Sequence, residues 1–190
     1  MAMKLDEAIR CRRSVRNFSN KPVNWGKLSL VLEAATHAPC AGGISTVKLI
    51  VVSDHEKKKS ICDACQQDFV GKASFLIIVC SETSQTGRFY GERAKIYLRQ
   101  QAGAAIQNML LKATDLDLAC CWVGAFNEEF VKKELKIPID VQVEAIIPIA
   151  NALKQPTTKL RKAHIDLKKI VFFGSWRQTR EKMPKTIEAL

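Results

Sequence analysis

The sequence contains no long apolar segment. No stretch of its 190 residues stays apolar over the roughly 20 positions that a membrane-spanning helix needs. Its first residues, Met1–Glu7, contain no apolar signal core. We therefore expect a cytoplasmic protein that does not associate with a membrane.

The short motifs of common catalytic sites are also missing. The sequence has no G-x-S-x-G, no H-E-x-x-H and no P-loop, and Gly42-Gly43 lacks the G-x-G-x-x-G spacing of a dinucleotide-binding turn. Its three histidines, at positions 37, 55 and 164, occupy places where histidine is more often a surface residue than a catalyst. No side chain is therefore predicted to be catalytic, which favours an enzyme whose reactivity belongs to a bound cofactor.

The cysteines do not indicate a disulfide framework or a metal site. There are seven, an odd number, and without an export signal they are expected to be reduced thiols. Cys62 and Cys65 form a single C-x-x-C motif, and a zinc site would need a second ligand pair that the histidines do not supply. Cys80, Cys120 and Cys121 lie in apolar runs and are expected to pack in the core.

Composition and charge are those of one globular domain spanning residues 1–190. Hydrophobic residues make up 47% of the chain and charged residues 26%. The net charge of +11 attracts nucleic acids or anionic small molecules. Because no helix-turn-helix, zinc finger or aromatic RNA-binding motif accompanies this charge, we expect no specific nucleic-acid partner.

Hydrophobic periodicity predicts an α+β domain with helices packed on a central sheet. Helices are expected over residues 5–10, 24–36, 54–65, 90–115 and 127–135, and strands over 47–53, 75–80, 119–126 and 141–150, with 167–173 as a further edge strand. The second half of the helix over 90–115 is apolar around nearly its whole circumference. Part of its cover is therefore expected to come from a second subunit.

One short segment is rich in phosphate-binding groups. Arg12, Arg13 and Arg16 surround Ser14 near the end of the first helix. Guanidinium groups present a planar set of donors that matches phosphate oxygens. Taken alone, such a cluster is more often a solvated basic helix end. A loop of small residues over 40–46 offers a second place where the backbone can approach a ligand closely.

Several segments, taken together and in order, resemble the nitroreductase family of flavin enzymes. Residues 12–18 resemble its R-R-S-x-R-x-F motif, residues 38–43 its A-P-S-A-G-N loop and residues 67–74 its Q-x-x-V-x-x-A-P segment. Further similar segments follow in the family's order at 104–111, 121–126, 137–138 and 167–176. The resemblance covers nearly the whole chain.

The resemblance implies a nitroreductase-like central mixed β-sheet flanked by helices, an α-β-α sandwich, in an intertwined homodimer with two FMN sites at the subunit interface. It also implies NADH or NADPH as electron donor and a small oxidised acceptor, such as a nitroaromatic or a quinone. Hydride would pass through flavin N5 in a ping-pong reaction. The sequence does not choose between NADH and NADPH.

The same resemblance assigns residues to one side of the cofactor. Arg12 and Ser14 would hold the FMN phosphate and ribityl chain, with Arg13 alongside. Arg16 would lie beside the pyrimidine ring, where its charge favours the reduced anion. Gln67 would reach the pyrimidine edge.

A second set of assigned residues completes the expected site. Pro39, Cys40 and Ala41 would come from the partner subunit against the isoalloxazine, together with Gly43, which stands where the family commonly has Asn. Cys40 replaces a Ser of the family and is either a redox-sensitive thiol or a small filler residue. An Asp usual at the start of the central helix is replaced by Gln101.

The resemblance also assigns main-chain donors and a second phosphate clamp. Val123, Gly124 and Ala125 would offer N–H groups to flavin N5. Arg161 and Lys162 are candidates for the clamp, and a different register puts His164 in that place.

Two other functions stay open. One is a specialised relative that uses flavin in a biosynthetic reaction, such as flavin destruction or dehalogenation. The other is a degenerate flavin fold that binds nucleic acid through its basic charge.

Overall fold

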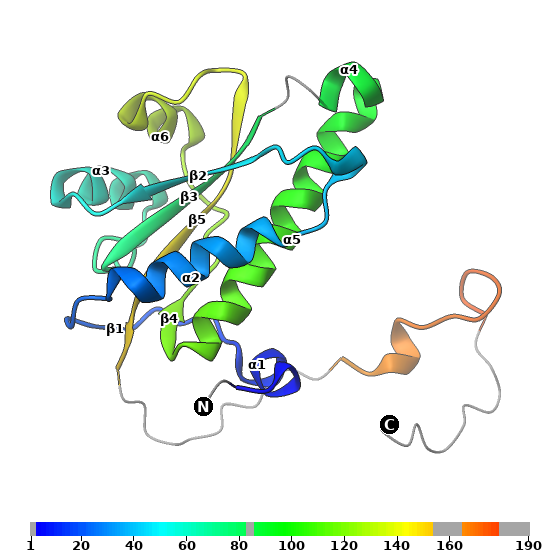
Figure 1. The fold of residues 1–190 in the computed structure, drawn as a ribbon, viewed down its shortest axis with the longest axis horizontal. Helices are drawn as coiled ribbons and strands as arrows, with labels where there is room; N and C mark the ends of the chain where they lie inside the picture. The colour runs from blue at the N-terminus through cyan, green and yellow to red at the C-terminus, as the bar shows by residue number, and fades with distance from the viewer. Residues whose placement is uncertain (1–2, 83–85, 154–164, 179–190) are drawn as a thin grey trace. The chain divides into compact units, whose positions relative to one another are not determined.

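The computed structural model describes residues 3–82, 86–153 and 165–178 (Figure 1). The chain divides into two compact units, Met1–Lys154 and Gln155–Leu190. Each unit is described by itself. Within the described residues, no helix is long and apolar enough to cross a membrane.

A sheet forms the centre of the first unit (Figure 1). Five strands occur among its described residues, and four lie in the spatial order β1 (Phe18–Ser19), β5 (Val141–Ala152), β3 (Phe75–Glu82) and β2 (Val47–Val52). The fifth, β4 (Leu118–Cys120), also pairs with β5. Every strand pair among these residues is antiparallel.

Helices cover both faces of this sheet, which confirms the predicted α+β class. On one face α2 (Trp25–Thr36) and α5 (Ala94–Asp115) pack against alternate residues of β3, such as Ile77 and Val79. On the other face α3 (His55–Cys65) and α6 (Glu128–Leu135) pack against Leu76 and Ile78. This period of two explains why residues 75–80 of β3 are an unbroken apolar run, since both faces of the strand are buried there.

Capping side chains fix the start of three helices where the sequence predicts them. Asn24 accepts a hydrogen bond from the Gly26 N–H at the start of α2. Asp54 accepts one from the Lys57 N–H at α3, and Asn127 one from the Phe130 N–H at α6. Each cap satisfies a main-chain donor that the first helical turn leaves unpaired.

The long central helix is shorter than predicted at its beginning. The helix expected over 90–115 is interrupted: α4 (Thr86–Tyr90) is followed by a 3-10 turn (Gly91–Arg93), and α5 begins at Ala94. Gly91 has a φ of 52°, a left-handed conformation that stops a helix and that glycine adopts without strain.

The strand predicted over 119–126 is also shorter than expected. Regular pairing with β5 ends at Cys120, and beyond it Val123 makes only an isolated bridge with Ile146. Trp122 and Gly124 on either side of this bridge are exposed.

The second unit contains no strand within residues 165–178, so the edge strand predicted over 167–173 is wrong. A 3-10 turn (Leu167–Lys169) stands there instead. The Asp166 side chain accepts from the Lys168 N–H, and the Leu167 carbonyl accepts from the N–H groups of Ile170 and Val171. These local bonds use the main-chain groups that strand pairing would need.

Candidate functional site

Residues 12–16 form an extended segment between α1 (Leu5–Cys11) and β1. Arg12, which ends the helix, has φ −52° and ψ 129°. The Val15 N–H donates to the Cys120 carbonyl of β4 over 2.9 Å, which fixes the segment to the sheet. Because alternate side chains of an extended chain point to opposite sides, Arg12 and Arg16 are expected on one side with Ser14.

The electrostatics of Cys121 agree with this alternation. Burial raises the pKa of the Cys121 thiol, and the charge of Arg16, a hydrogen bond from Ser14 and the charge of Arg12 each act to lower it. All three side chains therefore act on the same thiol. They form a positive patch with a hydroxyl at the edge of the sheet.

Arg13 has a different local role. Its Nη1 donates to the carbonyl oxygens of Arg10 at 2.6 Å and Arg12 at 2.9 Å. These are carbonyls at the C-terminal end of α1, where a positive charge is favourable. Arg13 thus caps the helix.

A second segment reaches the site from the turn after α3. Gln66 has a φ of 51° and ends that helix. The Gln67 side chain then donates from Nε2 to the Ala125 carbonyl at 3.5 Å. Two residues later, the ring of Phe69 lies under the guanidinium of Arg16 at 5.8 Å and meets the ring of Phe18 edge-on at 6.0 Å. Gln67 and Phe69 therefore join the segment around Arg16 to the turn around Ala125.

The turn over 123–125 is the third segment of the site. Val123 exchanges two hydrogen bonds of 3.0 Å with Ile146, so its N–H is used within the sheet. Of the three N–H groups expected to face a cofactor, those of Gly124 and Ala125 remain. Neither donates to a main-chain group of the described residues, and both residues are exposed.

The small-residue loop does not lie with the three segments described above. It contains Pro39, Cys40, Ala41 and Gly43. In Figure 1 the loop lies near α4, whereas α1 lies at the other end of α5. A 3-10 turn (Ala41–Gly43) shapes the loop. Gln101 of α5 then anchors the stretch that follows, donating from Nε2 to the Ile44 carbonyl at 3.2 Å and accepting at Oε1 from the Thr46 hydroxyl at 2.6 Å.

The strand register shows how far the small-residue loop lies from the Arg12–Arg16 segment. The loop leads into Val47 of β2, which pairs with Ser81, and Ser81 pairs with Gln142 of β5. Cys120, beside the Arg12–Arg16 segment, pairs with Ile149 of the same strand. From Gln142 to Ile149 is about 23 Å at the usual rise per strand residue. Within one chain the two groups of predicted residues thus lie at opposite ends of the sheet.

Three further expectations concern the second phosphate clamp, a metal site and the contacts of Arg16. Arg161, Lys162 and His164, the candidates for a second phosphate clamp, are outside the described residues. In the part of the chain that the structure describes, no group of three or more His, Cys, Asp or Glu side chains is placed to bind a metal ion. Phe69 carries no charge and occupies an unspecified position of the segment over residues 67–74, so sequence reasoning missed its contact with Arg16.

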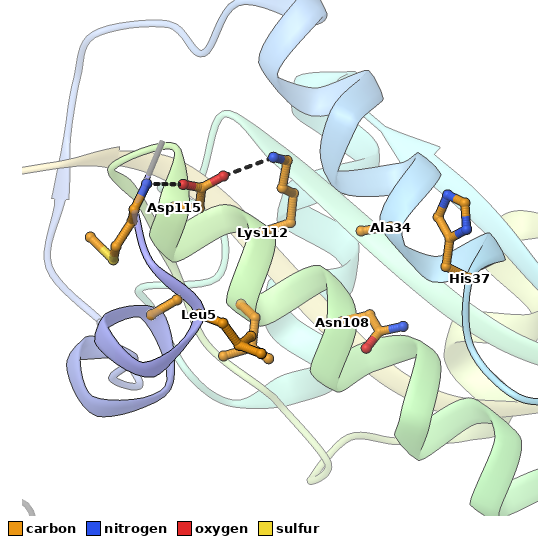
Figure 2. Close-up of a pocket in the computed structure, with 9 residues that line it drawn as sticks. Leu5, Ala34, His37, Asn108, Lys112 and Asp115 are labelled. Atoms are coloured by element: carbon orange, nitrogen blue, oxygen red, sulfur yellow. Dashed lines mark hydrogen bonds and ion pairs between the residues drawn. The ribbon is translucent and has the colours of Figure 1, made fainter. Parts of the chain in front are cut away.

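A pocket of about 340 Å³ lies away from these residues, between α1, α2 and α5 (Figure 2). Its lining is mostly apolar and includes none of the predicted cofactor ligands: Met3, Leu5, Ala8, Ala34, His37, Asn108, Leu111, Lys112 and Asp115. Figure 2 shows Leu5 where α1 meets α5, and Asn108 on α5.

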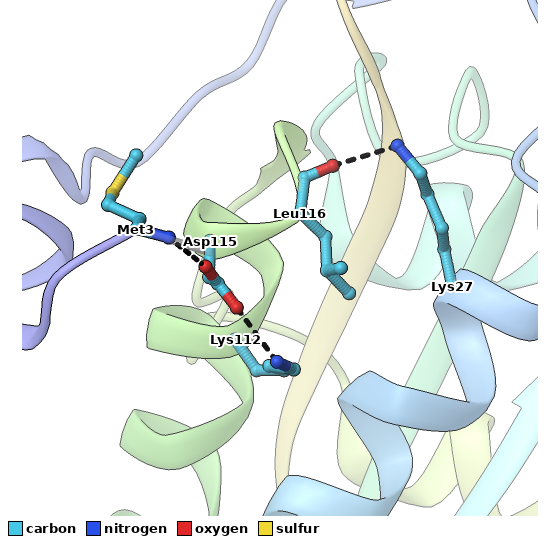
Figure 3. A network of polar contacts seen from close by, with 5 residues as sticks. All are labelled: Met3, Lys27, Lys112, Asp115 and Leu116. Carbon is cyan, nitrogen blue, oxygen red and sulfur yellow. Dashed lines mark hydrogen bonds and ion pairs between the residues drawn. The ribbon is translucent and has the colours of Figure 1, made fainter. Parts of the chain in front are cut away.

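Three of the residues that line the pocket, Met3, Lys112 and Asp115, belong to a polar network (Figure 3). The Asp115 carboxylate accepts from the Lys112 ammonium at 2.7 Å and from the Met3 N–H at 2.8 Å. The hydrogen bond from Lys112 is the largest cause that lowers the pKa of Asp115, and the bond from Met3 adds to it. In the same region Lys27 of α2 donates to the Leu116 carbonyl. Asp115 thus holds the segment before α1 against the end of α5.

The sequence of this chain is similar to a family model and to sequences of known proteins. The family model described as "Nitroreductase family" matches residues 9–68 and 59–150. A protein from Methanothermobacter thermautotrophicus with the provisional name NADH dehydrogenase/NAD(P)H nitroreductase is 28% identical over 162 residues, which are 83% of this chain and 82% of that protein.

Solved structures extend the similarity to the fold. A nitroreductase family protein from Clostridium difficile strain 630 is 27% identical, with a TM-score of 0.80 over 92% of this chain and 100% of that one. An FMN-dependent nitroreductase from Clostridium difficile strain R20291 is 25% identical, with a TM-score of 0.73 over 89% of this chain and 98% of that one. With a family model matched over most of its length, this chain belongs to the nitroreductase family.

Proposed function

We propose that this protein is an FMN-dependent oxidoreductase that uses NADH or NADPH to reduce small acceptors such as nitroaromatics or quinones. The observation that carries the proposal is the meeting of three segments: Val15 is bonded to Cys120, Arg16 lies over the ring of Phe69, and Gln67 reaches the Ala125 carbonyl in the exposed turn at Gly124. The names of the relatives support it, since one is FMN-dependent and another is an NAD(P)H nitroreductase.

The residues present fit FMN by their chemistry. Arg12 and Ser14 supply a guanidinium and a hydroxyl of the kind that bind a phosphate. The N–H groups of Gly124 and Ala125 supply donors that can orient the edge of a flat ring system. Arg16 places a positive charge where negative charge on the ring would be stabilised. When bound, FMN supplies the hydride chemistry that no side chain of the site provides.

The role of the chain's own residues is to hold the cofactor-binding groups in place. Phe69 restricts Arg16 to the space above its ring. The guanidinium therefore has less conformational entropy to lose when a ligand binds. Gln67 bridges to the Ala125 carbonyl and steadies the turn that presents the free N–H groups. Val123, bonded twice to Ile146, anchors the same turn to the sheet. These contacts organise the site before a ligand arrives.

We further propose that the complete site needs two chains. The loop from Pro39 to Gly43 lies at the far end of the sheet from Arg12, and a second copy of the chain would bring its loop to the Arg12 site of the first. A homodimer would also cover exposed apolar side chains on and near α5, among them Ile96 and Phe89. Light scattering coupled to size exclusion tests this proposal, and a monomer at micromolar concentration would contradict it.

The absorption spectrum of the purified protein tests the function most directly. We expect the two visible bands of oxidised flavin, either as purified or after reconstitution with FMN. The bands should bleach when NADH or NADPH is added without oxygen and return when 4-nitrobenzoate follows. A protein that stays colourless after reconstitution and oxidises neither nicotinamide would refute the proposal.

The same samples distinguish a specialised flavin reaction from simple reduction of an acceptor. Chromatography of the cofactor after many reductive cycles would show intact FMN for the proposed oxidoreductase. Conversion of the FMN itself into another product would show that the flavin is the substrate.

A further inference from the structure

Two tyrosines and an arginine form a compact cluster where α4 meets α5. The rings of Tyr90 and Tyr97 meet edge-to-face, with centroids 5.1 Å apart and an interplanar angle of 88°. The guanidinium carbon of Arg93 lies 5.7 Å from the centroid of the Tyr97 ring, and its Nε donates to the Tyr97 hydroxyl at 3.1 Å. Arg93 is thus held by both a cation–π contact and a hydrogen bond.

This cluster lies against the small-residue loop. A β-carbon added to Gly42 would be only 2.6 Å from the Tyr90 hydroxyl oxygen, so the loop and the tyrosine are in direct contact. Gly42 also has a φ of 59°, which favours glycine. Tyr90 therefore lies beside Cys40 and Ala41, the residues assigned to the cofactor ring under the proposed function.

Arg93 retains binding capacity after these contacts. A guanidinium has five N–H donors, and only the one on Nε is used among the described residues. The side chain is exposed. The neighbouring Glu92 is paired with Lys95 at 3.9 Å. The surroundings therefore leave Arg93 available to an anion.

We propose that Arg93 and the two tyrosines select acceptors that are flat, aromatic and negatively charged. The tyrosine rings provide an aromatic wall next to the loop, and the immobilised guanidinium binds a carboxylate, sulfonate or phosphate on the acceptor. This inference rests on the proposed function, because the loop must border the cofactor for the cluster to face an acceptor.

The test isolates the step in which the acceptor reacts. The FMN-loaded enzyme is reduced with light and an amine donor, so that no nicotinamide competes for the site, and is then mixed with 4-nitrobenzoate or with nitrobenzene. The two probes differ in one carboxylate. We expect Arg93→Ala to slow reoxidation by 4-nitrobenzoate about fivefold relative to nitrobenzene, the loss expected for one exposed charge pair. Arg93→Lys should keep most of the preference.

Arg88→Ala is the matched control, because it removes the same charge from the neighbouring surface without touching Tyr97. Its ratio of the two rates should equal that of the parent. An Arg93→Ala variant that binds FMN normally and slows both probes equally, or neither, would overturn the inference. A parent protein that binds no FMN would instead refute the proposed function, so the two failures are distinguishable.

Discussion

The guanidinium of Arg16 lies over the ring of Phe69, with its central carbon 5.8 Å from the ring centroid. Phe69 is itself supported edge-on by Phe18. A charged side chain is therefore fixed by an apolar residue 53 positions later in the sequence. The position of this charge depends on packing as much as on the motif that contains Arg16.

Replacing Phe69 tests this dependence. Phe69→Leu keeps an apolar side chain but removes the ring face, so FMN affinity should fall about two- to fivefold, the range of an exposed cation–π contact. Phe69→Tyr keeps the ring and should bind FMN like the parent. Quenching of FMN fluorescence by the apoprotein measures both. Equal affinities for Phe69→Leu and the parent would show that Arg16 needs no support from the ring.

Two adjacent arginines should give different phenotypes. Arg12→Ala removes a candidate phosphate ligand, and we expect a folded protein whose FMN affinity is at least about tenfold lower, since hydrogen bonds to charged groups contribute most. Arg13→Ala removes the cap on the α1 carbonyls, so it should lower the free energy of unfolding by about 0.5–1 kcal/mol and affect FMN less. FMN titration and urea unfolding separate the two effects. A larger loss of FMN in Arg13→Ala would reverse the assignment.

The loss of stability expected when Gly42 is replaced has two causes, which can be measured separately. Gly42→Ala brings a β-carbon to 2.6 Å from the tyrosine hydroxyl and also imposes a φ of 59° on alanine. The left-handed conformation alone costs about 1–2 kcal/mol. Adding Tyr90→Phe removes the hydroxyl. The double variant should therefore regain the stability lost to the steric contact, and it should still lack the stability lost to the left-handed conformation. Thermal unfolding measures both. A double variant no more stable than Gly42→Ala would show that the hydroxyl is not what excludes the methyl group.

Asp115 should make stability depend on acid pH. Hydrogen bonds from Lys112 and Met3 hold its pKa below the ordinary value of 3.8 in the folded protein. A lowered pKa stabilises the folded state above the ordinary value, and this contribution is lost as the pH falls through the lowered pKa. Asp115→Asn should therefore be less stable than the parent near neutral pH, and the difference should shrink toward pH 3.

Asp117→Asn is the matched control for that measurement. Asp117 is exposed and has a φ of 57°, a conformation that asparagine tolerates well. Its unfolding free energy should follow that of the parent across the pH range. If Asp115→Asn followed the parent equally closely, the network of Figure 3 would contribute nothing measurable.

The local features of this fold could be predicted from the sequence. Asn24, Asp54 and Asn127 start helices because their side chains accept from main-chain N–H groups two or three residues away. The unbroken apolar run over residues 75–80 predicts a strand buried on both faces. In each case the deciding interaction involves near neighbours or simple burial.

Features that depend on distant partners could not be predicted in the same way. The Arg12–Arg16 segment is fixed to the sheet by the hydrogen bond from Val15 to Cys120, a residue more than 100 positions away. The apolar residues at 167–173 have a strand-like composition, yet the Asp166 side chain and local carbonyls use the main-chain groups in a turn. Propensity carries no information about which of these partners is available.

The distance between the Arg12 segment and the small-residue loop has a genetic consequence for the proposed dimer. A chain that lacks Arg12 still carries an intact loop, and a chain with a damaged loop still carries an intact Arg12. When the two inactive chains associate, one of the two shared sites receives both defects and the other receives none. Co-expression of the two variants should therefore restore activity that neither has alone, as intragenic complementation between alleles of one gene.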